Sequence, residues 1–235
     1  MTSERRTALL VGILFLITYA TSITTKVALF PPVLTQADYI VTAVSDTRAL
    51  WGAFLEVILI IANVGTAVAF FRILKRQNEN LALAFVAARI MECVLIGVGI
   101  LSVLSVVTLR QDFADSTGAD ATALATVGQA LVALHDWTFN LGPGFVVGVG
   151  NGLILGYLTY RSGLVPRGMA VLGLIGGPLI CLSGVAIMFG IIQPDSAPLL
   201  IASVPEFFWE LSLGIYLVVK GFKASPILID TVDGR

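Results

Sequence analysis

Residues 51–108 are WGAFLEVILIIANVGTAVAFFRILKRQNENLALAFVAARIMECVLIGVGILSVLSVVT. Two apolar runs, 51–74 and 81–108, lie on either side of a short basic and polar segment. A helix rises about 1.5 Å per residue and needs around 20 apolar residues to cross a hydrocarbon core about 30 Å thick. Both runs are long enough, so this stretch predicts two transmembrane helices joined by a short loop.

Three further runs of spanning length occur at 7–25, 169–192 and 199–219, each bounded by charges, prolines or polar turns. The first run follows a basic start, as in a signal peptide. It is too long for one and lacks a convincing small-residue cleavage site, so we expect a retained first helix.

The stretch 121–160 is too long for one span and barely long enough for two. Gly142-Pro143-Gly144 divides it, because proline interrupts helical hydrogen bonding. Residues 144–160 are apolar enough to span, whereas 121–139 is amphipathic. We therefore predict six transmembrane helices and an extra interfacial amphipathic helix before the fourth span.

The composition also indicates a protein embedded in lipid. Of the 235 residues, 57% are hydrophobic and 12% are charged, and the mean hydropathy is +0.95. The net charge of −1 argues against nucleic-acid binding, which needs a basic face. We predict an all-α, polytopic helical bundle forming a single domain over 1–223, followed by a short, loose tail at 224–235. Cys93 and Cys181 lie in apolar runs and are expected to be unpaired.

The distribution of Lys and Arg predicts the orientation, because cationic residues near helix ends stay on the cytoplasmic side. Ten of the fourteen lie at the N-terminus, in the second and fourth loops and in the tail: Arg5, Arg6, Arg72, Lys75, Arg76, Arg161, Arg167, Lys220, Lys223 and Arg235. The opposite side has Lys26, Arg48 and Arg110, with the aspartates Asp38, Asp46, Asp112, Asp115, Asp120, Asp136 and Asp195. We expect both termini in the cytoplasm.

Five charged residues lie inside predicted spans: Glu56, Arg89, Glu92, Glu206 and Glu210. Charges at this depth are costly unless they are paired or hydrated. Arg89 and Glu92 are three residues apart, and Glu206 and Glu210 are four apart, so each pair shares a helix face that should point into the bundle.

Two interpretations of these charges remain open. In the first, Arg89 bridges Glu92 and one acid of the sixth helix, and the charges only hold the helices together. In the second, Glu56, Glu206 and Glu210 line a polar cavity that opens to the outer face and binds a proton, a cation or an amine-bearing ligand. Asn63 lies two turns below Glu56 and is a candidate for the same face.

His135, the only histidine, is expected with Asp136 at the outer interface. It is either an ordinary interfacial residue or a titrating gate beside an acidic vestibule. A single histidine predicts no metal site, since zinc and copper usually need several His or Cys ligands. No nucleotide-binding glycine loop or hydrolase motif occurs in the sequence, so no cofactor is expected.

Glycines recur at four-residue spacing along the predicted fourth span: Gly144, Gly148, Gly152 and Gly156. Such a row of small residues allows another helix to approach closely. The partner is either the fifth helix of the same chain, through Gly173 and Gly177, or the same helix in a homodimer.

Several segments of the chain are distinctive: Tyr160-Arg161-Ser162-Gly163-Leu164-Val165-Pro166-Arg167, Val171-Leu172-Gly173, Arg89-x-x-Glu92, Pro205-Glu206, Trp209-Glu210-Leu211-Ser212 and Lys220-Gly221-Phe222. They resemble an uncharacterised bacterial family of multi-pass membrane proteins, the domain of unknown function 4386. The resemblance covers nearly the whole chain. It implies a six-helix protein of the bacterial inner membrane and supplies no reaction, cofactor or catalytic residue.

The leading functional hypothesis is a binding or transport-like protein that uses Glu56, Glu206, Glu210 and the Arg89/Glu92 pair to handle a small ligand or a proton. One alternative is a structural or regulatory membrane subunit. The other is an intramembrane enzyme acting on lipid, with a glutamate as acid or base and His135 near the headgroups.

Overall fold

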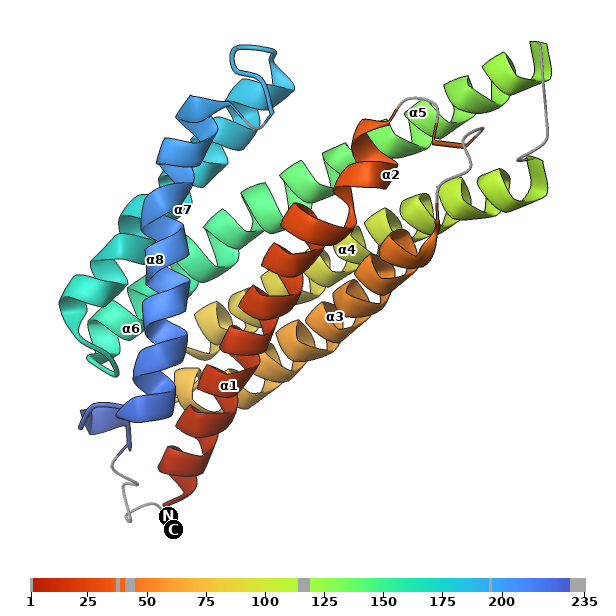
Figure 1. Cartoon of the computed structure of the whole chain (residues 1–235). Helices are drawn as coiled ribbons and strands as arrows, with labels where there is room; N and C mark the ends of the chain where they lie inside the picture. Colours follow the sequence, from red (N-terminus) through yellow and green to blue (C-terminus); the bar gives the residue numbers. More distant parts are fainter. Residues whose placement is uncertain (1, 37–38, 41–44, 114–118, 195, 229–235) are drawn as a thin grey trace.

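The computed structural model describes residues 2–36, 39–40, 45–113, 119–194 and 196–228, and these form a bundle of helices without strands (Figure 1). The long helices are α1 (Ser3–Thr24), α3 (Thr47–Leu74), α4 (Glu79–Phe113), α5 (Ala119–Phe139), α7 (Arg167–Met188) and α8 (Ala197–Val219). The shorter ones are η1 (Thr25–Leu29), α2 (Pro31–Thr35), η2 (Asn140–Val146), η3 (Gly148–Leu155), α6 (Gly156–Ser162) and η4 (Pro226–Leu228). The aspartates predicted at 38, 115 and 195 lie outside the described residues.

Six helical segments within the described part of the chain are long and apolar enough to cross a membrane: Ser3–Leu29, Thr47–Leu74, Glu79–Phe113, Asp120–Ser162, Arg167–Met188 and Ala197–Val219. The predicted all-α bundle with six membrane-spanning helices is therefore confirmed. Cys93 and Cys181 are free, as predicted.

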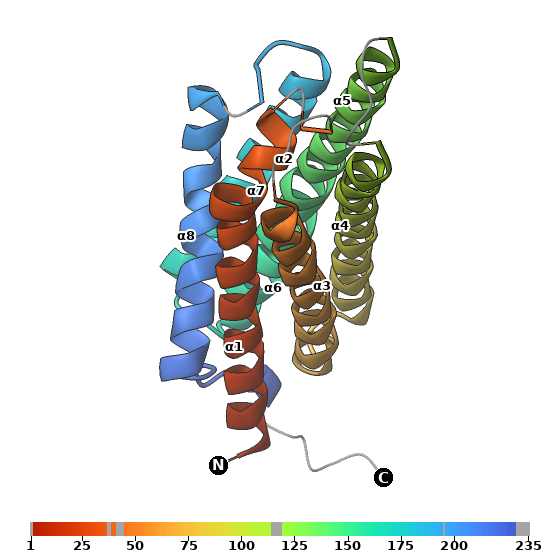
Figure 2. The same cartoon turned by 45° about the vertical axis from the view of Figure 1, so that its right-hand side comes forward.

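The long helices form a closed ring. Going round it, α1 packs on α3, α3 on α4, α4 on α5, η3 on α7, α7 on α8, and α8 returns to α1 (Figures 1 and 2). The Arg5 guanidinium donates to the carbonyl oxygens of Leu217 and Val218, at 2.8 and 2.7 Å. The beginning of α1 and the end of α8 therefore lie at the same end of the bundle, which we call the termini end.

The sequence predicts that Gly142-Pro143-Gly144 divides the stretch 121–160 into two helices. The structure shows no break at this position. The chain stays helical from α5 to α6, and η2 and η3 between them have π-helical hydrogen bonding. Proline lacks an N–H group and disturbs the regular α-helical ladder, and a wider turn is one way to include it without ending the helix. Whether 121–139 lies at the membrane interface stays a prediction.

The termini end is closed by a hydrophobic core in which Phe15, Phe70, Phe85 and Trp209 are buried. The segment after α8 belongs to this core, because the ring of Phe222 stacks on Phe70 with centroids 5.6 Å apart. The Ser225 hydroxyl donates to the Ser162 carbonyl oxygen at 2.5 Å. The expectation of a loose tail after Lys223 is therefore wrong as far as Leu228, and residues 229–235 lie outside the described part.

Candidate functional site

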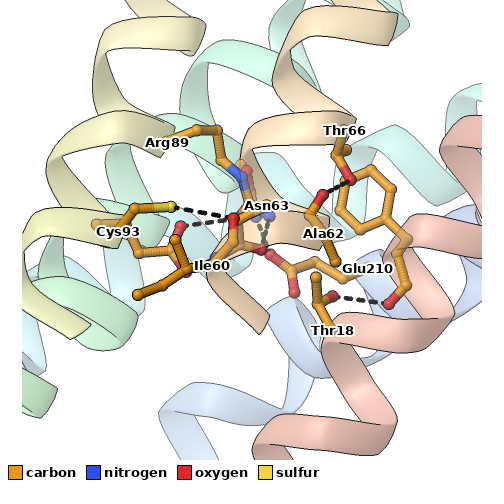
Figure 3. Close-up of polar contacts among 11 residues, drawn as sticks. Thr18, Ile60, Ala62, Asn63, Thr66, Arg89, Cys93 and Glu210 are labelled. Atoms are coloured by element: carbon orange, nitrogen blue, oxygen red, sulfur yellow. Dashed lines mark hydrogen bonds and ion pairs between the residues drawn. The ribbon is translucent and has the colours of Figure 1, made fainter. Parts of the chain in front are cut away.

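A buried polar cluster joins α3 and α4 near the middle of the bundle (Figure 3). Arg89 Nη1 donates to Glu92 Oε2 at 2.8 Å, and Asn63 Nδ2 donates to Glu92 Oε1 at 3.0 Å. Arg89 Nη2 also donates to Asn63 Oδ1. Each of the three side chains is at most 5% exposed. The helix spacing brings Arg89 and Glu92 onto one face, and Asn63 completes a closed triangle with them.

Glu210 of α8 approaches this cluster from the other side of the bundle (Figure 3). Its carboxylate accepts a hydrogen bond from Asn151 Nδ2 of η3. The indole N–H of Trp209 donates to the Asn151 backbone oxygen at 3.0 Å. Glu210 and Arg89 are close enough to interact electrostatically. Asn151 therefore links α8 to the π-helical stretch, as Asn63 links α3 to α4.

Two cavities, with a small pocket between them that we call the neck, follow one another from this cluster towards the end of the bundle opposite the termini. The central cavity, about 200 Å³, is bordered by Arg89, Glu92 and Glu210. The distal cavity, about 390 Å³, is bordered by Lys26 and Asp136 and by Pro194, which precedes α8. The neck, about 10 Å³, shares lining residues with both. These shared residues are Ser22 and Phe139 for both cavities, Glu56 and His135 for the distal one, and Leu59 and Pro143 for the central one.

Glu56 and His135 lie together at the neck, although they are far apart in the sequence. Both are largely buried, at 9% and 5% exposure, and Glu56 Oε2 has no hydrogen-bond partner among the described residues. His135 Nδ1 lies 3.6 Å from Asp136 Oδ1, and its ring meets the Phe30 ring edge-on. Lys26 lies above the Phe139 ring, with Nζ 4.2 Å from its centroid. The neck is therefore a polar constriction between the two cavities.

Glu206 has different surroundings from Glu210, although the two lie one turn apart. It is 3% exposed, and neither carboxylate oxygen has a hydrogen-bond partner among the described residues. A Cβ placed on Gly152 or Gly176 would lie 2.8 Å from Glu206 Oε2. The carboxyl group thus occupies space that exists because these two positions of η3 and α7 are glycine.

The glycines of the fourth span face α7 of the same chain. A Cβ on Gly148 would lie 2.7 Å from the Gly177 carbonyl oxygen, and one on Gly156 would lie 3.3 Å from the Leu174 nitrogen. Gly144 differs, because a Cβ there would meet only the Phe139 oxygen of its own helical stretch, at 3.7 Å. The two helices approach closely from Gly148 onward.

A second polar group ties together the end of the bundle opposite the termini. Arg110 Nε donates to Asp46 Oδ1 at 2.7 Å, and the Tyr39 hydroxyl donates to the same oxygen at 3.1 Å. Burial and the neighbouring Asp46 carboxylate raise the pKa of Tyr39. This group fixes the α3 start to the α4 end and lies outside the two cavities.

Asn151 is the member of the site that sequence reasoning missed. It is 0% exposed in a run otherwise made of glycine and aliphatic residues. An isolated amide in such a run is a usable signal, because a buried polar side chain in lipid needs a partner. Among the described residues, no group of three His, Cys, Asp or Glu side chains is arranged to hold a metal ion.

One comparison with known proteins finds a relationship. The family model described as "Domain of unknown function (DUF4386)" matches residues 10–221. No curated protein and no solved structure matches the chain.

Proposed function

The chain belongs to the DUF4386 family, a domain of unknown function, and from its own site we propose that it binds a proton, a small cation or an amine-bearing ligand in the central cavity. The ligand reaches the cavity from the outer face of a bacterial inner membrane. A transport-like cycle would require a second state in which the core at the termini end opens.

The observation that supports this proposal is a set of neighbouring cavities that share lining residues and lead to buried acids. Their walls carry four carboxylates, Glu56, Glu92, Asp136 and Glu210, and two cationic side chains, Lys26 and Arg89. A surplus of acids in a low-dielectric site favours a proton or a cation over an anion or a neutral molecule. Glu206 adds a further acid close to Glu210 and contributes to the same surplus.

The proposed orientation places the termini end in the cytoplasm. Arg5 of α1, Arg72 of α3 and Lys75, directly after α3, lie at this end, and cytoplasmic loops of membrane proteins are rich in Lys and Arg. The distal cavity then faces the outside. The large aromatic side chain Trp51, 56% exposed near the start of α3, fits the outer interface.

A structural or regulatory role is the second candidate, and the hydrogen-bonded triangle of Asn63, Arg89 and Glu92 favours it. A closed and fully buried network holds helices in register whether or not a ligand binds. In this case the charges serve packing, and the functional partner is another protein.

A homodimer through the fourth span is compatible with either role only if it uses a surface of that span other than the row of glycines. Gly148, Gly152 and Gly156 already contact α7 or Glu206 of the same chain. A dimer contact on this helix would have to use its lipid-facing side, where Leu153 and Tyr157 are exposed.

Thermal unfolding of the detergent-purified protein tests the proposal. The probes are tetramethylammonium, sodium and two pH values, and the variants are Glu56→Gln and Glu210→Gln. A ligand at about 100 times its Kd stabilises the folded state by about 2.7 kcal/mol, a shift that is easily measured. Glu79→Gln, an exposed acid at the start of α4, is the control.

Stabilisation by a probe or a pH change that is lost in Glu210→Gln and kept in Glu79→Gln supports the binding role. The absence of any shift in the wild-type protein would reject it. If Glu92→Gln, which neutralises the acid of the triangle, is then also at least as stable as wild type, the packing role loses its support as well.

A further inference from the structure

The central cavity is bordered by side chains of α1 and α8. Ile23 of α1 and Phe207 of α8 both line it. The same two side chains are 44% and 41% exposed. Both belong to membrane-spanning segments, so the surface that they expose faces the hydrocarbon of the bilayer. The cavity therefore has a lateral opening at membrane depth, in addition to the neck.

Tyr19 lies across this opening. Its hydroxyl donates to the Phe207 backbone oxygen at 2.6 Å, and the two rings meet edge-on with centroids 5.3 Å apart. This is one polar contact between two helices, supported by one aromatic pair. It can be broken and remade without disturbing the buried triangle around Arg89, since it shares no residue with it.

The side chains of α8 at the opening change from apolar to acidic within one helical turn. Phe207 is at the surface, and Glu210 lies three residues further along α8, inside the cavity with Glu92. Phe139 and Tyr19 add aromatic rings, whose faces attract a cation. A cationic group entering here would thus meet two carboxylates and aromatic faces together, against the single guanidinium of Arg89 among the described lining residues, so the balance of charge favours a cation over an anion.

The size of the cavity limits what can enter. About 200 Å³ is less than the roughly 300–1,000 Å³ of pockets that enclose drug-sized ligands. A small head group fits, and the remainder of a longer molecule has to stay outside. At a lateral opening, the outside is the acyl-chain region of the bilayer, where a hydrocarbon tail is favoured.

We propose that the ligand of the central cavity is an amphiphilic monovalent cation: an ammonium head group bound by Glu92 and Glu210, with a hydrocarbon tail that leaves between α1 and α8. This inference rests on the proposed function and specifies its ligand class. It assigns Tyr19 and Phe207 as the residues at which the tail passes from protein to lipid.

Photolabelling in nanodiscs of phosphatidylglycerol, a lipid without an amine, tests this inference. The probe is dodecyltrimethylammonium with a diazirine in the middle of its chain, and mass spectrometry locates the label. We expect Ile23 and Phe207 to be labelled about tenfold more than Ile61, a residue of α3 that is even more exposed, at 66%. An alcohol with the same diazirine chain should show no such preference.

The variant Glu92→Gln/Glu210→Gln should reduce labelling of Ile23 and Phe207 to the level of Ile61, while thermal unfolding shows whether it folds. The alcohol comparison needs no variant, so it decides the question if this one does not fold. Equal labelling of the three positions by the cationic probe would overturn the inference. If tetramethylammonium, sodium or a change of pH nevertheless stabilises the protein, the proposed function stands without the lipid route; if none of them does, both fail.

Discussion

Asn63 of α3 and Arg89 of α4 face each other across the helix interface, and the asparagine oxygen accepts a hydrogen bond from the guanidinium. The asparagine nitrogen donates to Glu92, the ion-pair partner of Arg89. An amide suits this position because it offers an acceptor to the cation and a donor to the anion at once. No aliphatic side chain of similar size can do the same.

Replacing Asn63 should therefore lower the free energy of unfolding by more than the size of its side chain implies. Asn63→Leu leaves Arg89 and Glu92 each without one buried hydrogen bond, and we expect a loss of about 1–3 kcal/mol in the free energy of unfolding in detergent. Val64→Ala, on the lipid-facing side of the same helix, is the control and should change little. An Asn63→Leu variant as stable as wild type would contradict the role assigned to this triangle.

The ion pair between Arg89 and Glu92 should show strong coupling. Removing one partner of a buried pair typically costs about 3–5 kcal/mol, because the other charge stays buried alone. We expect Arg89→Met and Glu92→Gln each to be clearly destabilised, and the double variant to lose less than the sum. A double-mutant cycle measured by unfolding gives the coupling energy directly. Simple additivity would show that the two side chains do not depend on each other.

The contact between the fourth span and α7 should respond to a single methyl group. Gly148→Ala places a Cβ 2.7 Å from the Gly177 backbone oxygen, which cannot move aside as a flexible side chain would. We expect a loss of about 1–3 kcal/mol in stability, as for overpacked sites. Gly144→Ala is the matched control, since its Cβ meets only one atom at 3.7 Å. Equal effects of the two substitutions would argue against close helix contact at Gly148.

The orientation can be tested by labelling single cysteines in intact cells. The background carries Cys93→Ala and Cys181→Ala, and the two reporters are Asn80→Cys near the termini end and Gln193→Cys at the opposite end, both exposed. A membrane-impermeant maleimide should label Gln193→Cys in intact cells and Asn80→Cys only after permeabilisation. The reverse pattern would place both termini outside.

The spans are predictable from the sequence because lipid offers the backbone no hydrogen-bond partners, so each apolar run has to close its bonds within a helix. The pairing of Arg89 with Glu92 is predictable for a similar reason, since residues three apart on a helix are neighbours. Both inferences use only local geometry, which the order of residues determines.

The remaining parts of the site depend on how the helices pack. Regular α-helical spacing suggests that Glu206 and Glu210 share one environment, yet glycines of two other elements surround the first and Asn151 binds the second. His135 is buried at the neck that Glu56 also lines, and nothing in the sequence between them indicates that they share this pocket. Asn151 reaches Glu210 from a stretch whose winding is not α-helical, so a helical wheel does not place it correctly.

The π-helical winding of η2 and η3 also determines how the fourth span tolerates a change in its length. In an α-helix, the loss of one residue rotates everything beyond it by about 100°, and in α3 this would turn either Glu56 away from the neck or Asn63 away from its partners. A π-helical turn closes over one residue more than an α-helical turn. A deletion within η2 can thus be absorbed by tightening that turn, and the helix on either side keeps its phase. Relatives that differ by single-residue insertions or deletions should therefore carry them between Asn140 and Leu155.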